Sequence, residues 1–199
     1  GLDFTKANTD VSGSGGISIN NSSNTAMHGK SFGILAGYGQ TIRGIYIGGE
    51  IGGDLNFSQG KTNSSDTTNQ VTINNHIKKN NSLYLAGRIG KQISGETLLY
   101  LKGGIASNSY NIKSDVNFVG RLVSVSSSTT KRVTQPIIGT GVEFYGGMLT
   151  RKASWRVGAE YEHTFKRNIT NLVSSENFNG NTKISASSNT IKLRFIVSL

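Results

Sequence analysis

The sequence predicts an all-β fold: an eight-stranded antiparallel up-and-down barrel that spans a membrane with its strands. Three observations support this prediction. Apolar and polar residues alternate with a period of two in eight segments, long and short connections alternate between these segments, and the polar faces combine glycine with charged residues. We expect residues 1–199 to form one transmembrane barrel domain, with a signal peptide and a few residues of the mature chain lying upstream.

Each predicted strand is a segment in which successive side chains alternate in polarity. In the third segment, Ile47 and Ile51 share one face, while Tyr46, Glu50 and Asp54 share the other. The eight segments are residues 1–7, 29–41, 45–57, 80–90, 97–110, 133–145, 153–165 and 187–199.

The connections between these segments alternate in length. Residues 8–28, 58–79, 111–132 and 166–186 are long and polar, whereas residues 42–44, 91–96 and 146–152 are short. Transmembrane barrels place short turns at the periplasmic rim and long loops outside the cell. We therefore expect four long extracellular loops and three short periplasmic turns.

The polar faces are expected to line the lumen. They carry acids and bases in nearly equal number, as a buried network of charges requires, and several glycines that make room for long side chains. A soluble ligand-carrying barrel, the alternative, would gain nothing from glycine on a face that meets solvent. The predicted structural ion network of the side-chain-filled lumen consists of Glu50, Arg88, Lys102, Glu143, Arg156, Glu160, Lys192 and Arg194.

The apolar faces are expected to meet lipid. Aromatic residues on these faces fall near the two ends of the predicted strands, where aromatic girdles of such barrels lie. The predicted lipid-face aromatics are Phe32, Tyr38, Phe57, Phe144, Trp155 and Phe165.

Five segments carry a resemblance to a known family: SFGILAGYGQ (Ser31–Gln40), YLAGRIG (Tyr84–Gly90), YLKGGIA (Tyr100–Ala106), GTGVEFY (Gly139–Tyr145) and SWRVGAEYEHTF (Ser154–Phe165). They resemble the small eight-stranded outer-membrane barrels of Gram-negative bacteria, a broad family that includes OmpA-like and OmpX-like domains and Opa-type surface antigens. The chain departs from this family in ending with Leu199, where an aromatic residue is common. The resemblance implies the fold and an outer-membrane location, while function in this family resides in loops that vary.

Few residues offer catalytic or cofactor chemistry. The chain has no Cys, and no spacing of its three His residues matches a metal site. His28 and His76 could ligate haem, but we interpret them as exposed loop residues and expect no cofactor and no metal. His163 and Glu162 are neighbours in a strand, so they point to opposite faces and do not form a catalytic pair. We therefore expect no enzyme.

The net charge of +10 resides mainly in the long connections and at the rims rather than in the lumen. Such loops suit lipopolysaccharide phosphates or anionic host glycans, and the distribution does not indicate nucleic-acid binding. The third long connection also contains Val116, Phe118 and Val125, which predict a projecting hairpin with an adhesive edge. The candidate loop contact residues are Lys61, Lys78, Lys79, Lys113, Arg121, Lys131, Arg132, Lys166, Arg167 and Lys183.

Together these features predict a monomeric, multi-pass protein of the bacterial outer membrane with loops exposed on the cell surface. We expect a non-enzymatic surface antigen or adhesin that contacts outer-membrane lipid, lipopolysaccharide and a host cell-surface or matrix molecule. Alternatives are a narrow channel, a protein that binds haem or another small solute, and a lipid-modifying enzyme.

Overall fold

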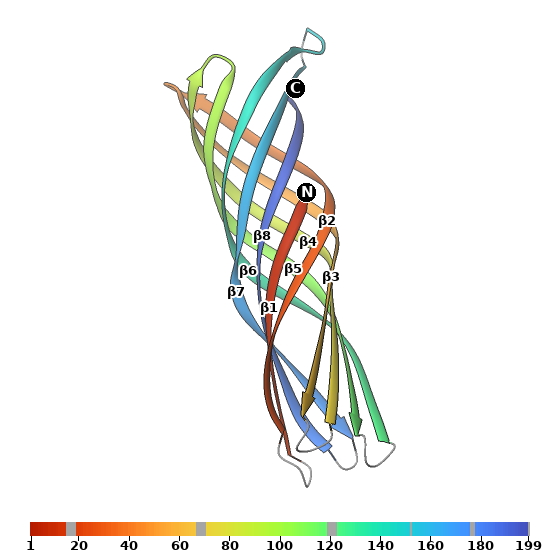
Figure 1. Cartoon of the computed structure of the whole chain (residues 1–199). Coiled ribbons are helices and arrows are strands. Elements are labelled where there is room, and N and C mark those ends of the chain that lie inside the picture. The colour runs from red at the N-terminus through yellow and green to blue at the C-terminus, as the bar shows by residue number, and fades with distance from the viewer. Residues whose placement is uncertain (15–18, 67–70, 119–122, 152, 176–177, 199) are drawn as a thin grey trace.

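The structure is a closed barrel of eight antiparallel strands, as the sequence predicts. This computed structural model describes residues 1–14, 19–66, 71–118, 123–151, 153–175 and 178–198. Each strand pairs with its neighbours in the chain, and β1 pairs with β8 to close the ring (Figure 1). The strands are β1 (Leu2–Ser14), β2 (Ile19–Ile42), β3 (Ile45–Asp66), β4 (Val71–Ser94), β5 (Thr97–Phe118), β6 (Val123–Met148), β7 (Ser154–Ser175) and β8 (Phe178–Ser198).

Short turns join the strands at one end of the barrel. Ile42 pairs with Ile45, and the two residues between them, Arg43 and Gly44, have φ angles of 51° and 81°. Positive φ at both central residues defines the two-residue hairpin turn whose twist matches that of its flanking strands. At the same end, Ser94 pairs with Thr97 and Met148 with Ser154, so the predicted short connections are short.

The long connections require a correction, because most of their residues extend the strands instead of forming loops; for the third, the predicted projecting hairpin is present, with Val116 paired to Val125. The pairing of β1 with β2 continues to Gly13↔Ile19, and the pairing of β5 with β6 continues to Phe118↔Val123. Hydrogen bonds between the strands satisfy the backbone of these polar Ser, Thr and Asn runs, and the few apolar residues among them are buried on the inner face. The hairpin tips, with Arg121 among them, lie outside the described residues.

Beyond the middle of the barrel the wall divides into two four-stranded sheets. Pairing between β6 and β7 ends at Ile137↔Thr164, and pairing between β2 and β3 ends at His28↔Gln59. Pairing within β3–β4–β5–β6 and within β7–β8–β1–β2 continues further. We call these two sheets the β3–β6 leaf and the β7–β2 leaf; Figure 1 shows their ends on the side of the barrel opposite the short turns.

A belt of apolar side chains surrounds the barrel between the short turns and the leaves. Ile51, Leu101 and Leu193 are 61%, 62% and 83% exposed on its outer surface, while Glu50 and Lys102 are 3% exposed inside. An exposed apolar belt around buried charges is stable against lipid rather than water, so the strands span a membrane. Among the described residues no helix is long and apolar enough to do so, a finding that does not bear on strands.

The predicted lipid-face aromatics all lie on this outer surface. Trp155 is half-buried because its ring stacks on Phe195, with centroids 5.8 Å apart. The other five are exposed: Phe32, Tyr38, Phe57, Phe144 and Phe165.

The polarity of the inner face reverses where the leaves begin. Between the leaves, buried apolar side chains replace the charges of the lumen, while Lys61 and Lys113 are exposed on the outer face. The two leaves therefore pack face to face like the sheets of a sandwich and close the outer end of the lumen. We call this cluster the outer core; it consists of Ala7, Met27, Ile77, Tyr110, Ile112, Ile169, Ile184 and Ala186, with Val133 packed against it.

Candidate functional site

The eight charged residues predicted to line the lumen all point into it and all take part in ion pairs. Glu50 lies at the centre. Its carboxylate lies 2.6 Å from Arg194 Nη2, 3.1 Å from Lys102 Nζ and 3.6 Å from Arg88 Nη1. Three strands, β4, β5 and β8, thus supply cations to one carboxylate on β3, which ties opposite sides of the wall together.

Glu160 on β7 forms a second centre of this network. It accepts hydrogen bonds from Lys102 Nζ at 3.0 Å and from the Tyr100 hydroxyl at 2.7 Å, and it also pairs with Arg194. Lys102 and Arg194 therefore each bridge Glu50 and Glu160. Buried charges are tolerated when each is paired and hydrogen-bonded in this way.

Pairs at both ends of the lumen extend the network. Towards the short turns, Glu143 binds Arg88 and lies 4.0 Å from Arg156. Towards the leaves, Lys192 Nζ lies 3.0 Å from Asp54 and 3.2 Å from Glu162.

Lys79 requires a correction, because it is not a loop contact residue. Its side chain is buried, and Nζ donates a 2.8 Å hydrogen bond to Asp3 inside the barrel. A register shift between Lys79 and Ser82 changes the alternation expected from the sequence. With Lys79, the described lumen holds six bases against six acids, Asp3, Glu50, Asp54, Glu143, Glu160 and Glu162.

Glycines on the inner face make room for tyrosine rings, as their placement on the polar faces suggests. A Cβ atom added at Gly141 would lie 2.4 Å from the Tyr100 ring, and one at Gly52 would lie 2.5 Å from the Tyr84 ring. The tyrosine rings that occupy this space lie beside cations. The Arg88 guanidinium, for example, is 3.6 Å from the centroid of the Tyr100 ring. The lumen is thus filled by side chains from neighbouring strands.

Gln135 links the lumen to the outer core where β6 and β7 separate. Its Oε1 accepts hydrogen bonds from Asn108 and Tyr110, at 2.9 and 3.2 Å, and its Nε2 donates to the carbonyl oxygens of Phe165 and Ala186. Burial raises the pKa of the Tyr110 hydroxyl, which keeps it a neutral donor. The sequence analysis did not identify Gln135, because one polar residue in a strand carries no signal of such bonds.

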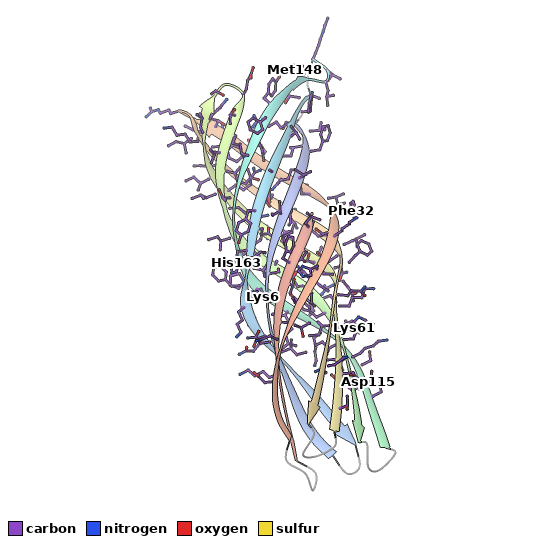
Figure 2. The ribbon with its side chains drawn as sticks, viewed as in Figure 1. Lys6, Phe32, Lys61, Asp115, Met148 and His163 are labelled. Carbon is purple, nitrogen blue, oxygen red and sulfur yellow. The ribbon has the colours of Figure 1, made fainter. Side chains whose placement is uncertain are left out.

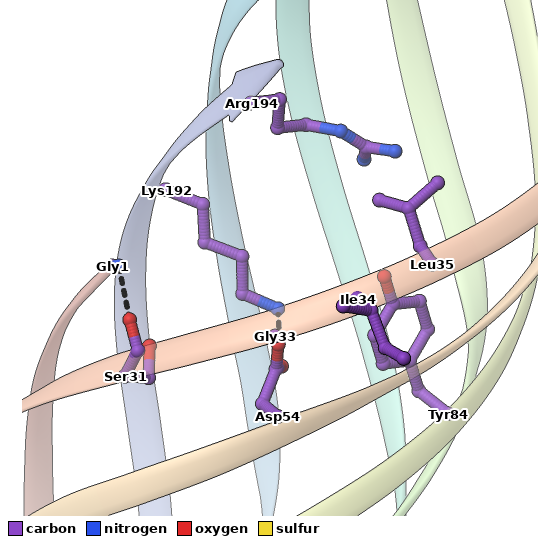
Figure 3. Close-up of a pocket in the computed structure, with 9 residues that line it drawn as sticks. All are labelled: Gly1, Ser31, Gly33, Ile34, Leu35, Asp54, Tyr84, Lys192 and Arg194. Carbon is purple, nitrogen blue, oxygen red and sulfur yellow. Dashed lines mark hydrogen bonds and ion pairs between the residues drawn. The ribbon is translucent and has the colours of Figure 1, made fainter. Parts of the chain in front are cut away.

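A small pocket opens beside Gly1, between β2 and β8 (Figure 3). Its charged lining residues are already paired. Lys192 binds Asp54 and Glu162, and Arg194 binds Glu50 and Glu160. The pocket therefore offers no unpaired charge from these side chains to a solute.

The histidines do not gather into a site. His163 Nδ1 lies 2.7 Å from Asn189 Oδ1 on the outer surface, while Glu162 points inward to Lys102, as predicted for neighbours in a strand. His28 packs edge-on against Phe4, with centroids 5.6 Å apart. Among the residues that the structure describes, no three His, Asp or Glu side chains lie together as a metal site would require.

The outer face of the β3–β6 leaf carries a row of basic side chains. The register places Lys61 on β3 opposite His76 on β4, and His76 opposite Lys113 on β5. Lys78, two residues from His76, adds a further exposed cation. We call Lys61, His76, Lys78 and Lys113 the basic face. The remaining described candidates are also exposed: Lys131, Arg132, Lys166, Arg167 and Lys183.

Comparisons with known proteins find similar solved structures. No family model and no curated protein matches the sequence. The solved structures include Ail, the attachment invasion locus protein of Yersinia pestis (11% identity, TM-score 0.30, 96% of this chain and 99% of that chain). They also include Neisserial surface protein A (10%, 0.28, 94% and 95%) and the outer membrane protease OmpT from Escherichia coli (12%, 0.36, 96% and 94%).

Because these identities and TM-scores are low, the topology of the chain is established by its own strand pairing alone. Eight strands pair in chain order and close between β1 and β8, around buried ion pairs and within an apolar belt. The chain is an eight-stranded up-and-down transmembrane β-barrel, the architecture of the small outer-membrane barrels that its sequence resembles.

Proposed function

We propose that this protein is a non-enzymatic surface protein of the Gram-negative outer membrane that binds an anionic glycan of a host surface or matrix. The basic face of the β3–β6 leaf carries the proposal. Lys61, His76 and Lys113 lie on three adjacent strands in one row, and Lys78 adjoins them. Closed β-barrels with polar lumens are the membrane-spanning form of outer membranes, and the leaves extend beyond the membrane as exposed sheets.

The arrangement of charge supports a polyanionic partner. Lys61 and Lys113 flank His76 with no carboxylate between them, so this row forms no cross-strand ion pair that would stabilise the leaf. The outward carboxylate closest along β5, Asp115, lies two residues beyond Lys113 (Figure 2). A sulfated or carboxylated glycan would supply several negative charges at the spacing of neighbouring strands.

The test is binding of the folded, detergent-solubilised protein to an immobilised sulfated polysaccharide of the heparin type. We expect Lys61→Gln/Lys113→Gln to weaken binding about tenfold and to reduce its salt dependence. Lys166→Gln/Lys183→Gln, which removes the same charge from the β7–β2 leaf, is the matched control and should bind nearly as the original chain does. Equal losses in the two double variants, or no loss in either, would contradict the proposal.

The filled interior favours a protein that displays a binding surface over a channel or a protein that binds a solute inside the barrel. The lumen charges are paired with one another, and the outer core closes the lumen between the leaves. A narrow channel would need a continuous polar path, and a haem site would need an imidazole facing an apolar cavity. We also propose that the protein acts as a monomer and without a cofactor.

A second candidate is strand addition at the free edge of β6. Within the described part of the chain, residues 123–136 of β6 pair with β5 but not with β7. Apart from the Thr134 carbonyl, which accepts a hydrogen bond from Arg167, this leaves one row of backbone groups available to an added strand. Deletion of residues 115–128 should then abolish binding to cells or matrix, and that binding should resist added salt. Unchanged cell and matrix binding after the deletion would refute this candidate.

A further inference from the structure

One residue of the basic face, His76 on β4, changes its charge with pH. The register sets it directly opposite Lys61 on β3 and directly opposite Lys113 on β5, so the imidazole stands between two ammonium groups in one row across the leaf. The same row continues on β6 with Ser128, which pairs with Lys113 and adds no charge. The protonation state of His76 therefore decides whether this row holds two positive charges or three.

The other charged groups around His76 on this face come from the two adjoining rows. In the row nearer the membrane, Lys78 is exposed, and the residues opposite it, Gln59 on β3 and Asn111 on β5, are uncharged. In the row nearer the hairpin tips, Asp115 on β5 lies on the diagonal from His76. Among the described residues of these three rows, positive groups therefore outnumber the one carboxylate even when the imidazole is neutral.

A ring nitrogen of His76 has no partner within the described chain. Its Nε2 is shielded from solvent and makes no hydrogen bond to a described residue, whereas His163 on β7 holds its Nδ1 at 2.7 Å from Asn189 Oδ1. A protonated imidazole carries a donor on both nitrogens. The ring of His76 therefore has hydrogen-bonding capacity that the described chain leaves unused and that an oxygen of a bound anion can satisfy as a charge-assisted hydrogen bond.

We propose that His76 links the binding of an anionic glycan on the basic face to the uptake of a proton, so that the affinity rises as the pH falls from 7.5 to 5.5. The inference rests on the proposed function above. Histidine is the side chain that ordinarily gains its positive charge in this range, whereas lysine stays charged throughout. A polyanion along the row is attracted more strongly by three positive charges than by two, and its negative charges in turn favour the protonated ring. The face would therefore bind more tightly at an acidified surface than in a neutral medium.

The test is binding of the folded, detergent-solubilised protein to dextran sulfate at pH 7.5 and at pH 5.5. The sulfate esters of this probe stay ionised at both pH values, so a change in affinity comes from the protein. We expect binding to be about fivefold tighter at pH 5.5, the effect of about one added surface charge. Titration calorimetry in buffers of different ionisation enthalpy should then show an uptake of up to about 0.4 proton per bound barrel, which a fivefold change requires.

Two substitutions reproduce the two charge states of His76. His76→Gln is neutral at both pH values and should bind at pH 5.5 as the original chain does at pH 7.5. His76→Lys is charged at both and should bind at pH 7.5 as the original chain does at pH 5.5. In each variant the affinity should differ less than about twofold between the two pH values. His28→Gln and His163→Gln are the matched controls, and both should keep the change of about fivefold.

Three results would overturn the proposal: equal affinity of the original chain at the two pH values, a pH dependence that persists in His76→Gln, or its loss in His28→Gln. Binding that does not change with pH but is still weakened by Lys61→Gln/Lys113→Gln would refute the proton linkage alone. Absence of binding at both pH values would refute the proposed function itself. A failure of the proton linkage and a failure of the proposed function are therefore distinguishable.

Discussion

Replacement of Glu160 by Gln tests whether the lumen charges stabilise the barrel as a network. Glu160 is 2% exposed and contacts Lys102 at 3.0 Å, the Tyr100 hydroxyl at 2.7 Å, and Arg194. Glutamine keeps the shape but removes the negative charge, so six lumen bases would face five acids. Loss of one partner from a buried ion pair costs about 3–5 kcal/mol, and we expect Glu160→Gln to lower the free energy of unfolding by about 3 kcal/mol.

Urea unfolding of the protein in bilayers, followed by Trp155 fluorescence and by gel migration with and without heating, measures this change. Lys102→Met in the Glu160→Gln background removes the surplus cation, and we expect it to restore at least about 1 kcal/mol of the loss. Lys91→Gln on the exposed rim should change stability by less than about 0.5 kcal/mol. A loss below about 1 kcal/mol for Glu160→Gln, or no recovery in the double variant, would refute the network as a source of stability.

Three further predictions concern the glycines, the outer core and conduction. Gly141→Ala should destabilise the barrel by about 1–3 kcal/mol because the new Cβ would meet the Tyr100 ring, whereas Gly103→Ala, with nothing within 4 Å, should be nearly neutral in the same unfolding assay. Ile112→Ala should cost about 2–5 kcal/mol by leaving a cavity between the leaves, and lipid-facing Ile105→Ala should cost clearly less; equal costs would contradict a packed outer core. Planar bilayer recordings should show no large, stable conductance, and porin-sized steps from the purified protein would contradict a filled lumen.

The membrane-spanning half of the fold could be predicted because lipid imposes a strict pattern. Outward residues there are mostly apolar or small and the charges point inward, so Leu83 and Leu85 alternate with Ser82 and Tyr84 along β4. The same pattern identified eight of the twelve described lumen charges, although it did not show which of them are partners. Partners such as Glu50 and Arg194 come from strands far apart in the chain, and barrel curvature brings them together.

The leaves could not be predicted in this way, because outside the membrane the polarity rule reverses. Met27, Ile77 and Ile112 are isolated apolar residues among Ser, Asn and Thr, so the sequence pattern places them in long connections. Their spacing does contain a signal: Tyr110 and Ile112, like Ile184 and Ala186, are two residues apart and share the inner face. An inward apolar pair directly after an inward charged face would have indicated where the membrane ends.

Site-directed spin labelling tests most directly whether the apolar belt faces lipid around a sealed interior. The chain has no Cys, so single Cys variants on β5 can be labelled without a background. We expect labels at Leu101 and Ile105 to collide with oxygen dissolved in the bilayer, a label at Lys113 to collide with a water-soluble nickel chelate, and a label at Ile112 to be shielded from both. Access of the chelate to labels at Leu101 and Ile105 would contradict a lipid-facing belt. Access of the chelate to a label at Ile112 as readily as to one at Lys113 would contradict an outer core that closes the lumen.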